Sequence, residues 1–99
     1  MKLNEKIVCK DGFEMSVQAH ESAYCHPRID NAERYEEAEV GYPSQYEPML
    51  MPWVENEERP FDTVYAYVPA SRVSLICAKH GGIVSGELPA GVPHIKVEE

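Results

Sequence analysis

Apolar and polar residues alternate near the start of the chain, and the alternation predicts a β-hairpin over residues 5–20. The apolar set occupies every second position: Phe13, Met15, Val17 and Ala19. Because successive side chains of a strand point to opposite faces, this set is expected to face a core and the polar residues between them to face solvent. Asp11-Gly12 is a typical two-residue hairpin turn, so residues 6–10 are expected to form the first strand.

Alternation returns at residues 36–42 and predicts a third strand, which is expected to end at Gly41 and Pro43. Glu37 and Glu39 are expected to face solvent. The apolar set, expected to face the core, is Ala38, Val40 and Tyr42. Residues 21–34 show no sustained period, and Pro27 disfavours a helical conformation at the residue before it. An extended or irregular segment is therefore expected between the second and third strands.

The region from Ser44 to Trp53 is compatible with a short helix that begins at Ser44 and is limited by Pro52. Pro48 is tolerated in such a helix only within its first turn. The charged residues that follow, from Glu55 to Pro60, predict a mobile loop.

A run of β-branched and aromatic residues predicts a strand over residues 63–68, and a helix is expected to begin at Pro69 and continue to His80. One face of this helix carries four residues at helical spacing: Val73, Ile76, Cys77 and His80. Gly81 is suited to a left-handed C-cap. The Pro- and Gly-rich residues 83–99 predict an irregular tail, in which Ile83-Val84 or residues 95–97 add an edge strand.

This order of elements, β-β-β-short α-β-α, predicts a small α+β fold. We expect one domain over residues 1–99, with a largely antiparallel sheet and one main C-terminal helix packed on one face.

Charge changes this picture because it is concentrated in one third of the chain. The stretch from Asp30 to Asp62 holds ten acidic residues and two basic ones, so its formal charge of −8 equals that of the whole chain. Such a field disfavours direct binding to nucleic acid or to an anionic membrane surface, and it favours a basic partner. The plainer interpretation is an acidic surface that only keeps the protein soluble.

The apolar runs and the cysteines of the chain indicate a cellular location. No apolar run approaches the roughly 20 residues that span a membrane, and the first residues do not read as a signal peptide. The three cysteines are odd in number and lack the spacing of a disulfide framework, which favours free thiols in a reducing cytosol.

The cysteine and histidine residues are the candidates for metal or thiol chemistry. Cys25 and His26 are adjacent, and Cys77 and His80 are three residues apart on one predicted helix face, so a four-ligand site is an alternative hypothesis. Their spacing matches no specific zinc pattern, and a buried cysteine with a histidine at a helix C-terminus needs no metal. No catalytic residues, metal or other cofactor are predicted.

The acidic and aromatic residues are the candidates for partner binding. The predicted site comprises Glu36, Glu37, Glu39, Glu55, Glu57, Glu58, Tyr35 and Trp53. Aromatic anchors surrounded by charge are typical of a protein interface with a steering rim. The competing interpretation is a solvated strand face, with the aromatic rings in the core.

Five segments of the chain resemble small uncharacterised phage-encoded proteins: FEMSVQA (13–19), YCHPR (24–28), VGYPS (40–44), VYAYVP (64–69) and KHGG (79–82). The resemblance covers about residues 12–82. It implies a phage or mobile-element origin and a life inside a bacterium, and it brings no active site with it.

A small, acidic, phage-like chain without a catalytic signature is similar in profile to anti-CRISPR and other anti-defence proteins, some of which look like DNA mimics. The leading hypothesis is therefore a non-enzymatic inhibitor that binds a host nucleic-acid-handling complex in the bacterial cytoplasm. Two alternatives stay open. One is a small metal-binding or thiol-dependent enzyme that uses Cys25, His26, Cys77 and His80. The other is a phage accessory or structural protein that forms oligomers, such as a homodimer, through its aromatic edge.

Overall fold

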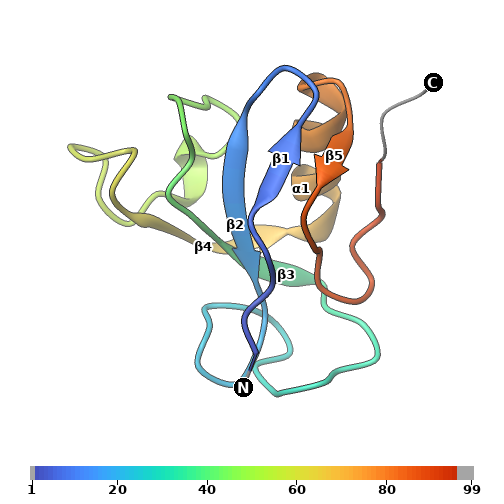
Figure 1. The fold of residues 1–99 in the computed structure, drawn as a ribbon. Coiled ribbons are helices and arrows are strands. Elements are labelled where there is room, and N and C mark those ends of the chain that lie inside the picture. The colour runs from blue at the N-terminus through green and yellow to red at the C-terminus, as the bar shows by residue number, and fades with distance from the viewer. Residues whose placement is uncertain (1, 96–99) are drawn as a thin grey trace.

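A computed structural model describes residues 2–95 of the chain and contains one five-stranded antiparallel sheet and one α-helix (Figure 1). The strand order across the sheet is β4-β3-β2-β1-β5. The strands are β1 (Ile7–Cys9), β2 (Glu14–Gln18), β3 (Glu37–Gly41), β4 (Val64–Pro69) and β5 (Ile83–Ser85). The helices are the 3-10 helix η1 (Met51–Trp53) and the α-helix α1 (Ala70–Lys79). The predicted α+β class with one main helix is confirmed.

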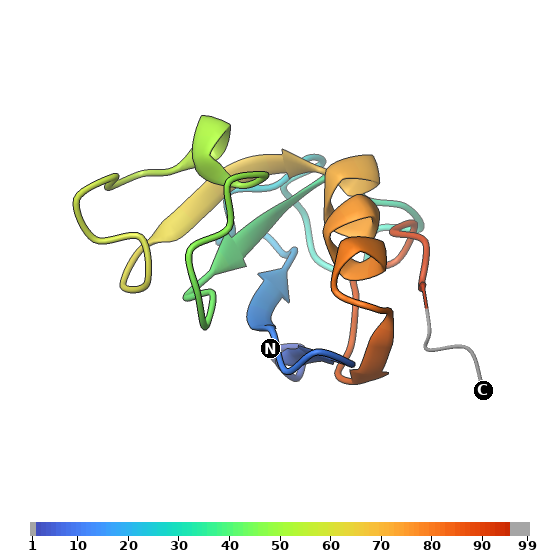
Figure 2. The ribbon, with the colours of Figure 1, turned by 90° about the horizontal axis from the view of Figure 1, so that it is seen from above.

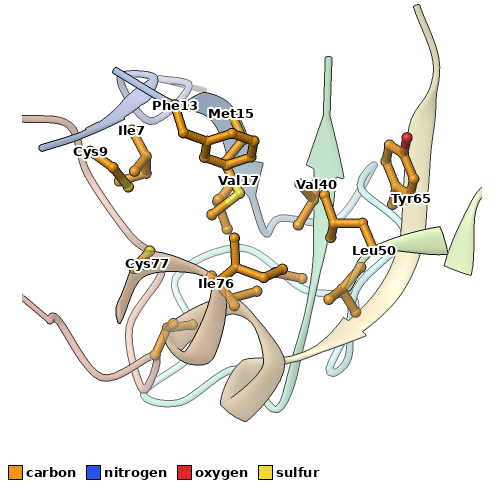
Figure 3. Close-up of a cluster of buried hydrophobic side chains, with 14 of the residues drawn as sticks. Ile7, Cys9, Phe13, Met15, Val17, Val40, Leu50, Tyr65, Ile76 and Cys77 are labelled. Atoms are coloured by element: carbon orange, nitrogen blue, oxygen red, sulfur yellow. The ribbon is translucent and has the colours of Figure 1, made fainter. Parts of the chain in front are cut away.

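The helix α1 packs on one face of the sheet, and the strands curve around it (Figure 2). Its buried residues, Val73, Ile76 and Cys77, are those that the helical spacing predicts. They meet the inward side chains of the strands, and a close-up of this core is shown in Figure 3. Burial of this apolar surface is the main favourable contribution to folding.

The hairpin of β1 and β2 forms where the alternation predicts it. Phe13, Met15 and Val17 are buried, whereas Ala19, beyond the end of β2, is only half-buried. Gly12 has φ +94°, which the Asp-Gly turn requires and which other residues adopt only with strain. The pairing of Ile7 with Met15 places both side chains on the helix-covered face.

The register of β3 and β4 contains a β-bulge. Ala38 pairs with Val68 and Val40 with Tyr65, so Glu39 faces two residues of β4, one of which is Tyr67. Uniform alternation would bury Tyr67 beside Tyr65. At the bulge Tyr67 takes φ +56° instead, and its side chain is exposed while Tyr65 and Val68 are buried.

Tyr42 corrects one prediction of the alternation. Ala38 and Val40 are buried as expected, but Tyr42 has φ +50° and is 57% exposed. Its N–H donates to Thr63 O at 3.1 Å, so the chain turns at the end of β3 and directs this side chain away from the core.

The short helix also differs from its prediction. Residues 44–47 are irregular, residues 48–50 form a turn, and the 3-10 helix follows at Met51–Trp53 with Pro52 inside it. Proline fits there because the first N–H groups of a helix need no intrahelical acceptor. Pro69 was expected to open α1, but it ends β4 and serves as the N-cap of the helix.

The segment after α1 has little regular structure beyond β5, which pairs with β1. It is nevertheless attached to the domain, because Val92 is buried in the core and the Tyr35 N–H donates to Ala90 O at 2.8 Å. Of the alternative edge strand at residues 95–97, only Ile95 is described, and its carbonyl accepts the N–H of Ile83. Lys96 and Val97 lie outside the described residues.

Two glycines with positive φ differ in the space that an added side chain would find, so substituting each by alanine separates steric overlap from backbone strain. A Cβ on Gly86 (φ +111°) would overlap Lys6 O and lie 2.6 Å from Ile7 Cα, whereas one on Gly12 (φ +94°) would meet nothing within 4 Å. We expect Gly12→Ala to lower the free energy of unfolding by about 1–2 kcal/mol, and Gly86→Ala to lower it more because the β1–β5 pairing must also shift. Urea denaturation of both variants measures this. Equal losses would contradict the predicted overlap.

Candidate functional site

The two aromatic residues of the predicted site lie inside the protein rather than on an open surface. Tyr35 is 4% exposed in a small second core with Ala23 and Cys25, and its hydroxyl donates to Ile29 O at 2.7 Å. Trp53 is half-buried against the main core, and the Arg72 guanidinium lies 5.2 Å from its ring centroid. The sequence left open whether these rings belong to the core. Tyr35 does, and Trp53 is partly buried against it.

The three strand acids differ in exposure. Glu36 is exposed, whereas Glu37 and Glu39 are half-buried on the face of β3 opposite α1. A carboxylate oxygen of Glu39 accepts the N–H of Tyr24 at 3.0 Å. Glu39 thus also has a structural role, because it fixes the loop that follows β2.

The loop acids Glu55, Glu57 and Glu58 are all exposed, and none forms an ion pair with another described residue. The loop that carries them is closed by backbone hydrogen bonds from Arg59 N to Asn56 O (3.1 Å) and from Asp62 N to Arg59 O (3.0 Å). It projects from the body of the protein beside the start of β4 (Figure 1).

Exposed aromatic rings accompany the acids at both ends of β4. At its start lie Tyr42 and Phe61, and Tyr46 lies in the segment after β3; each of the three is more than half exposed. Near its end, Tyr67 and Tyr24 form a ring pair with centroids 6.0 Å apart. The predicted site did not include these side chains, because alternation assigned Tyr42 to the core and a loop tyrosine carries no local signal of exposure.

A buried ion network centres on Glu47, a residue that the sequence pattern left on the acidic surface. Glu47 is 1% exposed, and its carboxylate accepts hydrogen bonds from Lys79 Nζ at 2.9 Å and from the Met49 N–H at 2.9 Å. Its other oxygen lies 2.7 Å from His80 Nε2, and His80 Nδ1 lies 2.6 Å from Asp11 Oδ2. The ring of Phe13 stacks on His80 at 4.1 Å.

The hydrogen-bond donors around the two carboxylates determine their pKa values. An ionised carboxylate only accepts hydrogen bonds, so each donor that reaches it stabilises its charged form. Burial alone would raise the pKa of Glu47, but bonds from Lys79, Met49 and His80 outweigh it and hold the pKa below its ordinary value of 4.5. The pKa of Asp11 is also lowered, chiefly by the Phe13 N–H and then by His80.

This network joins three segments but offers no reactive group. It connects the hairpin turn at Asp11, the loop at Glu47 and the end of α1 at His80, and every polar atom in it is bonded. Within residues 2–95 no buried side-chain nitrogen or oxygen lacks a partner. The arrangement therefore stabilises the fold rather than activating a nucleophile.

The thiols are unsuited to nucleophilic chemistry. Cys9, Cys25 and Cys77 are free and buried. Burial raises the pKa of all three, that of Cys77 to about 12, so the reactive thiolate is disfavoured. The Cys25 Sγ donates to the carbonyls of His20 and Pro27 at 3.3 and 3.4 Å.

The four residues of the alternative metal site are not brought together. Cys77 lies in the main core and Cys25 in the small second core, and the ring of His80 is held between two carboxylates. Over residues 2–95 no group of three histidine, cysteine or acidic side chains is placed to share a metal ion.

A shallow depression of about 640 Å³ lies where the N-terminal segment, the loop after β2 and residues 88–90 meet. Its lining includes Lys2, His20 and Asp30. The last two are engaged in hydrogen bonds within the loop after β2, because His20 Nδ1 accepts the Ser22 N–H and Asp30 accepts the Glu21 N–H. Of the predicted site residues only Tyr35 borders it.

Comparisons with protein-family models, with curated proteins and with solved structures find no match for this chain. Within residues 2–95 no helix has the length and apolar character of a membrane span. The functional argument therefore rests on the chain's own residues.

The Glu47 network predicts a loss of stability in acid. Because the pKa of Glu47 is lower in the folded state, its stabilising contribution is complete above about pH 4.5 and is lost as the pH falls through the lowered value. We expect Glu47→Gln to lower the free energy of unfolding by about 3–5 kcal/mol near neutral pH. The variant should also lose less stability than the parent protein as the pH falls below about 4.5. Lys79→Met, which removes a 45% exposed partner but leaves the bonds from Met49 and His80 to Glu47, should cost less stability than Glu47→Gln. Urea denaturation as a function of pH measures this. If Glu47→Gln lost as much stability in acid as the parent protein, the acid sensitivity would not arise from Glu47.

The buried thiols predict slow alkylation. We expect iodoacetamide at mildly alkaline pH to leave the native protein unmodified and to add three groups after unfolding in urea, because all three thiols are buried and disfavour the thiolate. Mass spectrometry counts the additions. Rapid single modification of the folded protein would instead identify a reactive cysteine and revive the thiol-enzyme hypothesis.

Proposed function

We propose that this protein is a small non-enzymatic inhibitor that binds a basic, nucleic-acid-binding surface of a host defence complex in the bacterial cytoplasm, as anti-CRISPR proteins do. The observation that carries the proposal is the projecting loop with Glu55, Glu57 and Glu58, whose exposed carboxylates have no ion-pair partner among the described residues. Unpaired carboxylates held on a hydrogen-bonded loop are available to a basic partner.

Apolar anchors beside these acids support a protein partner over a purely solubilising surface. Phe61 is 54% exposed on the same loop, and the exposed Tyr42 lies beside the start of β4, where its N–H donates to Thr63 O. Interfaces combine a few aromatic anchors with a charged rim, in which the charge accelerates encounter and the anchors provide most of the affinity.

The strand acids extend the acidic surface along the sheet. Glu37 pairs with Pro69 at one end of the β3–β4 ladder, and Gly41 pairs with Val64 at the other end, beside the loop. Four residues of extended strand span about 13 Å. In our proposal the two acidic clusters, separated by about this length, occupy positions that phosphates take on the partner, and so the protein competes with nucleic acid.

A charge-reversal experiment tests this function. We expect Glu55→Lys/Glu57→Lys/Glu58→Lys to abolish capture of the host complex from lysate, because the partner surface is basic. The matched control, Glu5→Lys/Glu21→Lys/Glu33→Lys, makes the same change in net charge at three exposed acids elsewhere and should retain capture.

Two further measurements make the result decisive. Added duplex DNA should release the captured complex, and the melting temperatures of both triple variants should stay close to that of the parent protein. Equal loss of binding in the two variants, or capture that DNA does not affect, would contradict the proposal.

A further inference from the structure

Two tyrosines of the chain adopt the left-handed backbone conformation, and both are exposed. Tyr42 has φ +50° and Tyr67 has φ +56°. For a bulky residue this region is strained, and such strain is concentrated at functional sites. Glycine would adopt this conformation at lower energy at both positions. The backbone turn therefore does not explain why a tyrosine occupies them, whereas a role for the exposed side chain does.

Tyr67 is the more firmly positioned of the two. The bulge places it opposite Glu39, and its N–H donates to Tyr24 O at 3.0 Å. The Tyr24 N–H in turn donates to Glu39 Oε2 at 3.0 Å. This chain of hydrogen bonds fixes the backbones of both tyrosines beside a carboxylate.

One of the two exposed rings, that of Tyr24, already contacts a guanidinium group. The Tyr24 and Tyr67 rings, 38% and 42% exposed, lie 6.0 Å apart at an angle of 39°. Arg28 places its guanidinium carbon 5.3 Å from the Tyr24 ring centroid, and its Nε donates to Glu21 O. Arg28 therefore provides an internal example of the cation–π contact that this cluster supports.

We propose that Tyr67, with Tyr24 and Glu39, forms the docking site for an arginine side chain of the basic partner protein. The inference rests on the proposed function and names the partner group. Glu37 and Glu39 lie on the adjacent β3, and Glu36 directly precedes it, so the surroundings are acidic and complement a cation. The free face of Tyr67 accepts the planar guanidinium by stacking.

Arginine fits this site better than lysine. Its guanidinium is planar and weakly hydrated, so it stacks on an aromatic face and still presents N–H groups to a carboxylate. A lysine ammonium is a compact, strongly hydrated charge. The acidic field attracts both cations alike, and the ring contact distinguishes them.

The probes are hexa-arginine and hexa-lysine amides of equal charge, titrated calorimetrically at low salt. We expect the parent protein to bind hexa-arginine about two- to fivefold more tightly, as one exposed cation–π contact predicts. Tyr67→Gly should reduce this ratio to one and leave the affinity for hexa-lysine unchanged. The matched control Tyr42→Gly, which replaces the other left-handed tyrosine, should keep the ratio.

Melting temperature verifies that the variants remain folded. Because glycine adopts positive φ without strain, Tyr67→Gly should melt about 4–8 °C higher than Tyr67→Ala. A lower melting temperature for Tyr67→Gly would overturn the strain on which the inference depends.

The outcomes separate this inference from the function beneath it. Equal affinity of the parent protein for both peptides, or an unchanged ratio in Tyr67→Gly, would overturn the arginine site and leave the proposed function standing. No binding of either peptide would overturn both. In Glu55→Lys/Glu57→Lys/Glu58→Lys, weaker binding of both peptides at an unchanged ratio supports both.

Discussion

The fold depends on the burial of one carboxylate. Glu47 lies almost wholly out of solvent, where an unpaired charge would be strongly unfavourable, so Lys79, His80 and a backbone N–H must all be in place when the chain folds. Meeting that requirement attaches the loop after β3 to the end of α1. Through His80 and Asp11 the same network reaches the hairpin turn, where the Asp11 N–H also donates to His80 O. Helix, loop and hairpin are thus held in one arrangement.

The opposite side of the molecule is organised by the bulge in β4. An edge strand with free N–H and C=O groups invites pairing with another chain. Here the outer edge of β4 is covered at both ends, by Glu55 N donating to Val64 O and by Tyr67 N donating to Tyr24 O. The bulge that makes the second contact also moves Tyr67 out of the core. One local irregularity therefore protects the edge and produces an exposed aromatic pair beside the strand acids.

The Glu47 ion network and the β4 bulge show that the acidic residues have different roles. Glu47 and Asp11 belong to the network that stabilises the fold, and Glu39 fixes the loop that carries Tyr24. Glu55, Glu57 and Glu58 are exposed, and within residues 2–95 their carboxylates form no ion pair. Composition treats all of these residues alike, whereas the hydrogen bonds separate those that hold the molecule together from those available for binding.

Local periodicity was enough to predict most of the fold. The period of two located β2 and β3, and the helical spacing of Val73, Ile76 and Cys77 correctly assigned the buried face of α1, because both patterns follow directly from backbone geometry. The Asp-Gly turn located β1, and a run of β-branched and aromatic residues located β4. The acidic loop of the candidate site was also recognisable as a charged segment between Pro52 and β4. The short helix was misplaced, since Ser44, Pro48 and Pro52 permit several turn conformations that only packing distinguishes.

Tertiary structure decided the rest. No local pattern shows that Glu47 is buried, because its partner His80 is 33 residues away and the interaction exists only when α1 lies against the loop. Likewise, alternation continues through Tyr42 and Tyr67, and only the pairing of β4 with β3 and with Tyr24 turns these side chains outward. The sequence by itself determined the elements and the location of the charge. Which acids and tyrosines are exposed was determined by contacts between residues distant in the chain, where the free energy of burial and pairing outweighs local preference.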